Sequence, residues 1–287
     1  MKQSGCRMFV YVVVSTCAVA CEPRGGALVT ERWAPLAEGA WSLDPGSENS
    51  SWCTEVVAEE TYISAFRPIV SPGTHHIALN LASRGDGGDC TVGRLGPETI
   101  YAAGPGTGEI HMPPGVALKL QQGQLLDLNL HVYNATWQPL RGVSGIEVLR
   151  ANPEAVAHQA GFVLVGPDRI SLPPKQRTTI AQTCSVVSEQ TVFALIPLMH
   201  KFGVSFKTTV TRAGESTVLY DGAFQFEEQT QLSLETIALR VGDTISVECT
   251  YDNPTYGFIT KGHVGGEICY SALLRFPSDA RVDCAAD

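Results

Sequence analysis

The sequence predicts an all-β protein built from two antiparallel, jelly-roll-like β-sandwich domains. The first observation is a series of short apolar runs, rich in β-branched residues, that alternate with the period of half-buried antiparallel strands. The second is the abundance of turn formers, with 28 Gly and 17 Pro among 287 residues. The third is the scarcity of helical periodicity. A chain of this length that is 44% hydrophobic can bury cores for about two domains.

The predicted strands lie in both halves of the chain. Glycine-containing turn signals at residues 212–215 and 220–222 are predicted to close hairpins between neighbouring runs. The clearest alternating runs are Val116–Leu120, Leu126–Val132, Val204–Val210 and Thr244–Cys249.

Interruptions of the strand pattern set the predicted domain boundaries. The best short helix candidate, residues 153–158, lies near the midpoint of the chain. Both halves contain a strand-borne histidine followed by a hairpin and a later cysteine, which fits two similar sandwiches side by side. We therefore predict domains at residues 51–152 and 153–287. Residues 22–50 are rich in Gly, Ser, Glu and Pro, and this composition predicts a tether.

Residues 1–21 have the pattern of an export signal. Lys2 and Arg7 accompany an apolar run at residues 8–14 that is too short to span a bilayer. The stretch Ala18–Cys21 resembles a bacterial lipobox, in which the cysteine becomes the acylated N-terminus. This resemblance predicts a cell-envelope lipoprotein, in the periplasm or at the outer membrane or cell surface. The alternative is a soluble secreted protein that is cut near Ala20.

The charge of the chain limits its partners. The formal net charge of −9 becomes −11 without the leader, because Lys2 and Arg7 are lost and 18 basic residues remain against 29 acidic ones. A nucleic-acid partner is therefore not expected. Contact with a membrane is expected only through the lipid on Cys21. The sequence does not identify a small-molecule substrate or a reductant.

Six of the nine cysteines follow the leader, and an even number in an exported chain predicts three disulfide bonds. None of the six belongs to a Cys-x-x-Cys pair, which argues against a zinc ribbon or a thioredoxin-like site. Spacing alone does not determine how they pair. The sequence also lacks a Gly-x-Ser-x-Gly elbow, a phosphate-binding glycine loop and a His-Glu-x-x-His motif.

The candidate metal ligands are three histidines in predicted strands, His75, His76 and His131. Three imidazoles without a cysteine partner form a donor set for redox-active copper or catalytic zinc. Neighbouring residues on a regular strand point to opposite faces. His75 and His76 can therefore share an ion only through a local bend or through different ring nitrogens.

An ordered series of motifs resembles a known family and extends over most of residues 50–284. The series resembles the copper type II, ascorbate-dependent monooxygenases, the family of peptidylglycine alpha-hydroxylating monooxygenase and dopamine beta-monooxygenase. Its members in the first half are Thr74–His76, Tyr101–Gly104, Met112–Val116 and Leu130–Asn134, and in the second half Ala160–Leu164, Pro173–Pro174, Met199–Gly203, Val241–Asp243 and Gly266–Tyr270.

The resemblance implies one copper in each domain. All three ligand positions of the first copper are histidines in this chain, His75, His76 and His131. The second copper, which binds dioxygen in the family, takes two histidines and a methionine. The matching positions in this chain are Leu198, His200 and Ile268, so two of the three have no donor atom.

Two residues near the second copper position are candidates to replace the missing ligands. His263, in the loop before Gly266, is the more plausible substitute, whereas Met199 would need a bulge to turn toward the face of His200. The simpler interpretation of Met199 is that it packs in the core, and that of His263 is that it lies in an exposed loop. The resemblance also implies three disulfide bonds, Cys53–Cys90, Cys184–Cys284 and Cys249–Cys269.

We therefore expect an exported copper-binding protein with one copper in its first domain. If other ligands rebuild the second site, the expected reaction is hydroxylation of a C–H bond with dioxygen and ascorbate or another reductant. The positions that hold a peptide carboxylate in peptide-hydroxylating members are Ile196 and Ala272 in this chain, which argues against a peptidylglycine substrate. A purely structural module with two empty sites is the third alternative, and the complete first histidine set argues against it.

Overall fold

The computed structural model describes residues 32–82, 99–104, 106–226, 231–262 and 266–284, without the side chains of residues 50–54 and 82. The predicted export signal, Cys21, the pair Cys53–Cys90 and His263 therefore lie outside what is described. Residues Arg32–Asp287 form one compact unit. None of the described residues belongs to a helix that is long and apolar enough to cross a membrane.

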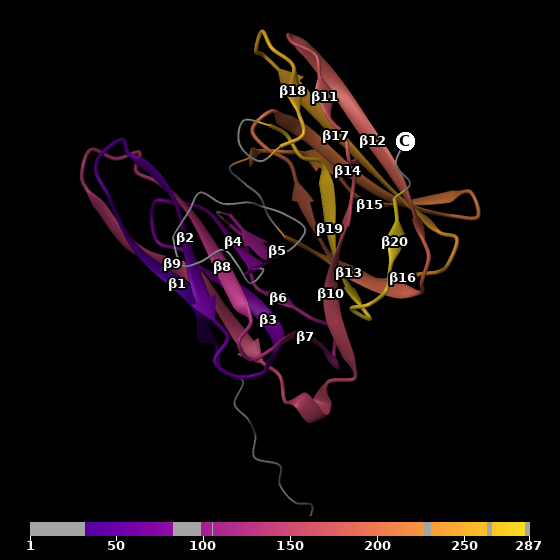
Figure 1. Cartoon of the computed structure of the whole chain (residues 1–287), viewed down its shortest axis with the longest axis horizontal. Coiled ribbons are helices and arrows are strands. Elements are labelled where there is room, and N and C mark those ends of the chain that lie inside the picture. The colour runs from indigo at the N-terminus through magenta and orange to yellow at the C-terminus, as the bar shows by residue number, and fades with distance from the viewer. Residues whose placement is uncertain (1–31, 83–98, 105, 227–230, 263–265, 285–287) are drawn as a thin grey trace, which may run out of the picture. The chain divides into compact units, whose positions relative to one another are not determined.

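Most of the described residues are in strands (Figure 1). The strands of the first half are β1 (Ala34–Leu43), β2 (Glu48–Val56), β3 (Thr61–Ile69), β4 (Thr74–Ala82), β5 (Thr99–Ala103), β6 (Ile110–His111), β7 (Val116–Leu120), β8 (Leu125–Tyr133) and β9 (Leu140–Arg150). A 3₁₀ turn, η1 (Pro153–Ala155), stands where the short helix is predicted. The second half contains β10 (His158–Val165), β11 (Ser171–Leu172), β12 (Gln176–Val186), β13 (Gln190–Leu198), β14 (Gly203–Arg212), β15 (Glu215–Ala223), β16 (Leu232–Leu239), β17 (Thr244–Asn253), β18 (Ile259–Thr260), β19 (Tyr270–Phe276) and β20 (Val282–Asp283).

One long sheet continues from the first half of the chain into the second. Its strand order is β1-β9-β3-β7-β10-β19-β13-β16, with β6 paired to β3. Strand β10 makes the connection, because it pairs in parallel with β7 and antiparallel with β19. Two further sheets, β2-β8-β4-β5 and β15-β14-β17-β12-β20, and the small pair β11-β18 complete the fold. The all-β fold class is confirmed, and the division into two domains at residues 152 and 153 stays a prediction.

Two hydrophobic cores lie in this arrangement, and strands β13 and β19 contribute to both. On β13, Ala194 and Ile196 belong to the first core, which also contains residues of β3, β4 and β8. Leu195 belongs to the second core, with residues of β12, β14 and β17. The two faces of β13 therefore meet different cores, which explains why its sequence is continuously apolar instead of alternating.

The predicted tether at residues 22–50 is wrong from Ala34 onward. Strand β1 pairs with β9 along its whole length, and its side chains of Ala37, Trp41 and Leu43 are buried. The Trp41 indole N–H donates a hydrogen bond to the Ser144 hydroxyl at 2.9 Å. The alternating apolar positions were present in the sequence, but the Gly, Ser, Glu and Pro around them gave the segment the composition of a linker.

One of the two predicted turns is confirmed and the other is wrong. Residues 212–215 connect β14 to β15, and Ala213 and Gly214 have φ values of 49° and 87°, as a tight hairpin turn requires. Residues 220–222 lie inside β15, where Gly222 pairs with Phe206. The Tyr220 hydroxyl lies 2.6 Å from where a Cβ on residue 222 would be. Glycine at this position therefore makes room for the tyrosine side chain and does not form a turn.

Matching loops follow β8 and β17 and are held by Asn134 and Asn253. Each asparagine Oδ1 accepts a hydrogen bond from the backbone N–H of the threonine two residues later, at 2.9 Å from Thr136 and 3.0 Å from Thr255. Both asparagine side chains are fully buried. Asn134-Ala135-Thr136 matches a glycosylation sequon, but in the folded chain its side-chain nitrogen donates to backbone carbonyls and is not accessible.

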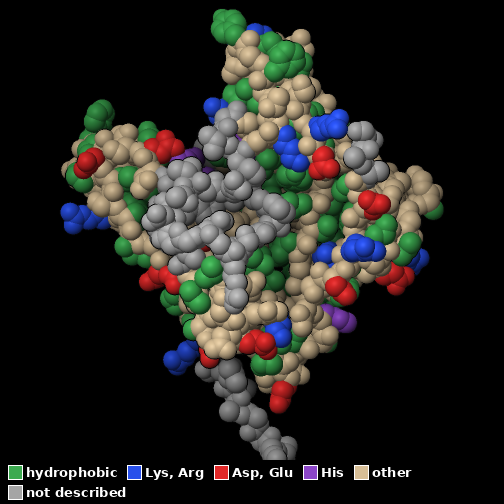
Figure 2. Space-filling view, viewed as in Figure 1, with side chains coloured by type: hydrophobic (Ala, Val, Ile, Leu, Met, Phe, Trp, Pro, Cys, Tyr) green, Lys and Arg blue, Asp and Glu red, His purple; other side chains and the backbone are tan. Residues whose placement is uncertain are grey.

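Charged side chains are spread over the surface. On the face drawn in Figure 2, the described Asp and Glu side chains are interspersed with Lys and Arg. Several form ion pairs, such as Arg67 with Glu147 at 2.6 Å. Arg67 and Glu147 are only partly buried, and pairs near the surface contribute little to stability.

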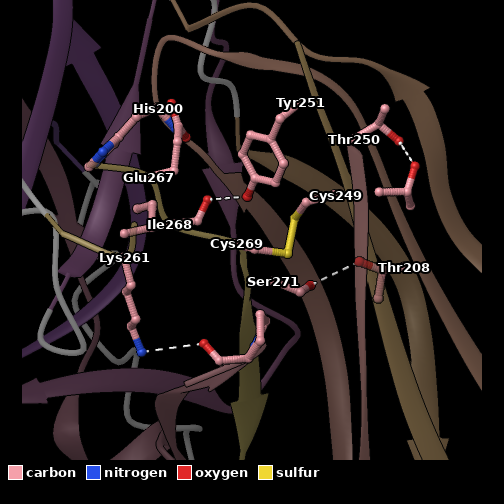
Figure 3. The surroundings of a disulfide bond; sticks show 12 residues. His200, Thr208, Cys249, Thr250, Tyr251, Lys261, Glu267, Ile268, Cys269 and Ser271 are labelled. Atoms are coloured by element: carbon pink, nitrogen blue, oxygen red, sulfur yellow. Dashed lines mark hydrogen bonds between the residues drawn. A yellow bond between two sulfur atoms is a disulfide. The ribbon is translucent and has the colours of Figure 1, made fainter. Parts of the chain in front are cut away.

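The described residues contain two disulfide bonds, Cys184–Cys284 and Cys249–Cys269, the second of which is drawn in Figure 3. They are two of the three pairs that the family resemblance implies. Because disulfide bonds persist in oxidising compartments, they indicate that the chain resides outside the reducing cytosol.

The two disulfides should differ in how much they stabilise the fold. The chain-entropy model predicts a loss of about 5 kcal/mol in the free energy of unfolding when Cys184 and Cys284 are both replaced by alanine, and about 3 kcal/mol for Cys249 and Cys269. The difference arises because the first bond closes a separation of 100 residues and the second one of 20. Urea unfolding of the two double variants measures it. Equal losses would contradict the loop-entropy explanation.

Candidate metal centre

The three predicted ligands lie on two neighbouring strands of the four-stranded sheet. His75 and His76 are on β4, and His131 is opposite His76 on β8. The register between the two strands shifts between Thr74 and His76, so His75 lies at a bulge. A bulge turns a side chain away from strict alternation. It provides the local bend that two adjacent histidines need in order to face one ion.

The imidazoles converge through their Nδ1 atoms. The Nδ1 of His131 is 3.2 Å from that of His75 and 3.3 Å from that of His76. One ring nitrogen from each of the three histidines can be chosen so that all lie within 4.8 Å of one another. Two nitrogens bonded at about 2.0–2.1 Å to one tetrahedral ion would be about 3.3 Å apart. The two separations measured from the His131 Nδ1 therefore fit a zinc or copper ion.

Two of the three histidines are largely shielded from water. The side chain of His131 is 12% exposed and His76 is 8% exposed. Burial, together with the nearby rings of His131 and His75, lowers the pKa of His76 to about 3. His76 is thus neutral at physiological pH, which is the form that binds a metal ion. The other nitrogen of His131, Nε2, contacts the carboxylate of Glu48.

His200 lies in a turn that follows β13, and its surroundings are those of a structural residue. The buried Glu267 carboxylate accepts hydrogen bonds from the backbone N–H groups of His200 at 2.9 Å and Phe202 at 2.8 Å. The His200 Nδ1 donates to the carbonyl oxygen of Gly266 at 2.9 Å. Figure 3 shows His200 and Glu267 next to each other above Ile268. Burial raises the pKa of Glu267 to about 7.

The positions beside His200 that would complete a second copper site are packed in the cores. Leu198 and Ile268 are 1% and 2% exposed and belong to the first core. Met199 is fully buried and belongs to the second core, as the packing interpretation predicts. Among the described residues, the histidine set on β4 and β8 is the one group of three or more His, Cys, Asp or Glu side chains whose donors converge.

Phe226 contacts both His76 and His200. Its ring centroid is 5.9 Å from that of His76 and 6.1 Å from that of His200. Neither Phe226 nor Glu48 was predicted from the sequence, because each acts through contacts with residues far away in the chain. Glu267 lies in the motif Gly266–Tyr270, but its contact with the backbone of His200 was not predicted. The structure thus brings His75, His76 and His131 together, and His200 contacts the same aromatic ring as His76.

Comparisons with known proteins add no functional information. No family model and no curated protein matches the chain. Among solved structures it is similar to infectious bursal disease virus, Gx strain, at 10% identity and a TM-score of 0.22, covering 88% of this chain and 76% of that one. It is also similar to allantoicase, at 9% identity and a TM-score of 0.17, covering 70% and 77%. Likenesses this weak carry no argument about function.

Proposed function

We propose that this chain is an exported copper-binding protein of the ascorbate-dependent monooxygenase family, with one copper held by His75, His76 and His131. The observation that carries the proposal is the convergence of the three Nδ1 atoms, at separations that suit a single ion. The donor set suits zinc as well as copper. The assignment to copper, and to the family, rests on the ordered motifs of the sequence.

Bound copper would supply one-electron redox chemistry at this place. The chain's own contribution is to present three imidazoles from two paired strands and to keep His76 neutral. The carboxylate of Glu48 orients His131 from outside the donor set. Attachment to the bacterial envelope through a lipid on Cys21 is part of the proposal, and the two disulfides support residence in an oxidising compartment.

The residues in the second half of the chain favour metal capture or electron transfer over hydroxylation as the function of the protein. Two of the three positions for a dioxygen-binding copper carry the buried, apolar side chains of Leu198 and Ile268. The remaining histidine, His200, uses Nδ1 in a hydrogen bond to a backbone carbonyl, so it could offer a metal at most one nitrogen. One imidazole nitrogen does not retain copper with useful affinity. Reaction with ascorbate or another reductant would then involve a single copper.

The number of copper ions per chain tests the proposal. We expect one copper per disulfide-intact chain after loading and dialysis, and the same value for His200→Ala, measured by elemental analysis. Loading with copper and zinc together shows which ion the site prefers. A second copper that is lost in His200→Ala would overturn the single-site proposal and support an active monooxygenase with substitute ligands. Absence of copper from the wild type would overturn metal binding itself.

A further inference from the structure

We propose that Glu48 is a positioning residue of the metal site, which fixes the proton of His131 on Nε2 and makes the site favour Cu(II) over Cu(I). This inference rests on the proposed function. It assigns a role to a residue outside the motifs that suggested that function, 83 positions away from His131 in the chain.

The contact with Glu48 determines the tautomer of His131. A neutral imidazole has one protonated nitrogen and one nitrogen with a lone pair. The Nε2 of His131 contacts the Glu48 carboxylate, which accepts hydrogen bonds. Nε2 must then carry the proton, and the lone pair is on Nδ1, which faces His75 and His76. The opposite tautomer would place a hydrogen among the metal donors.

The backbone around Glu48 holds its carboxylate in place. Glu48 is the first residue of β2 and pairs with Tyr133, two residues after His131 on β8. The chain just before it is fixed by two hydrogen bonds, from the N–H of Gly46 to the carbonyl of Asn134 and from the N–H of Asn134 to the carbonyl of Ser47, both at 2.9 Å. The carboxylate therefore comes from a paired strand end and not from a free loop.

The charge of Glu48 acts electrostatically on the metal site. A carboxylate that accepts the N–H of a metal-bound histidine makes that ring a stronger donor. Added negative charge stabilises a doubly charged ion more than a singly charged one. His76 hydrogen-bonds instead with the neutral side chain of Asn129. The charge of Glu48 thus acts on one ring of the set, at the edge where the carboxylate side chain is 61% exposed and can be replaced without opening the core.

The test compares Glu48→Ala and Glu48→Gln with Glu55→Ala, which removes an exposed carboxylate from the same strand. Affinities for Cu(II) and Cu(I) are measured separately by chelator competition, together with the reduction potential and the Cu(II) electron paramagnetic resonance spectrum. For Glu48→Ala we expect one copper per chain, about tenfold weaker Cu(II) binding and a smaller change for Cu(I). If the Cu(II) affinity falls tenfold more than the Cu(I) affinity, the one-electron potential rises by about 59 mV.

The glutamine variant separates orientation from charge. Its amide oxygen can still accept from Nε2, so we expect a wild-type spectrum with a raised potential. If Glu48→Ala matches Glu55→Ala in both affinities and in potential, the inference is wrong while the metal site stands. If the wild type binds no copper, both proposals are overturned. Unchanged thermal unfolding of the metal-free variants confirms that neither substitution disturbs the fold.

Discussion

Replacing His131 with alanine is expected to weaken copper binding by more than about 100-fold, which exceeds the loss typical of residues that only support a ligand. The reason is geometric, because the His131 Nδ1 lies within 3.3 Å of the other two Nδ1 atoms and is the one both approach. Without it, the two remaining imidazoles come from adjacent residues of one strand. Titration of the metal-free protein with copper against a competing chelator measures the loss.

The matched control is His111→Ala. His111 is exposed, contacts Glu109 at 3.1 Å and lies outside the histidine set. This variant should bind copper as the wild type does, and both variants should unfold at similar denaturant concentrations when metal-free. Copper binding that survives in His131→Ala would show that the ion is held elsewhere and would remove the basis of the proposed site.

Protonation of Glu267 is expected to make the metal-free protein more stable at mildly acidic pH than at alkaline pH. The fully buried carboxyl group has a pKa of about 7 in the folded chain, raised by burial from an ordinary value of 4.5. Between these values the folded state keeps a proton that the unfolded state has released. The stabilising effect is thus complete below pH 4.5 and is lost as the pH rises through 7, by about 3 kcal/mol in total.

The contribution of Glu267 is isolated by comparing the wild type with Glu267→Gln, which does not titrate. The difference between their free energies of unfolding should change by about 3 kcal/mol between pH 4.5 and pH 8.5. The comparison is needed because His76 acts in the opposite direction. Its lowered pKa means that stability is lost as the pH falls from 6.5 toward 3 in both proteins. Parallel stability profiles would show that Glu267 does not titrate in this range.

The sequence predicted those parts of the molecule that depend on local pattern. The alternating run Val116–Leu120 coincides with β7, and the bend required between His75 and His76 is present as a bulge. Parts that depend on distant contacts were not predictable in this way. Glu48 meets His131 only because β2 pairs with β8, and Phe226 meets His76 across the fold.

Composition misled the sequence analysis in one segment. Residues 34–43 have the small and polar residues of a linker, yet three buried side chains are enough to hold β1 on the sheet edge once β9 is available as a partner. Glycine misled it in another, because Gly222 makes room for Tyr220 and does not turn the chain. The identity of the metal stays a prediction, because three imidazoles suit more than one ion.

Strands β13 and β19 belong to two cores at once, and this ties the two halves of the chain together. A fragment that ends at residue 152 would lack Ala194, Ile196 and Leu274, and the apolar residues they cover would meet water. A fragment that begins at residue 153 would expose the other side of the same contact. If the histidine set binds copper, neither half is expected to serve as a minimal binding unit, so a shortened version for biochemical work should keep residues 34–284 together.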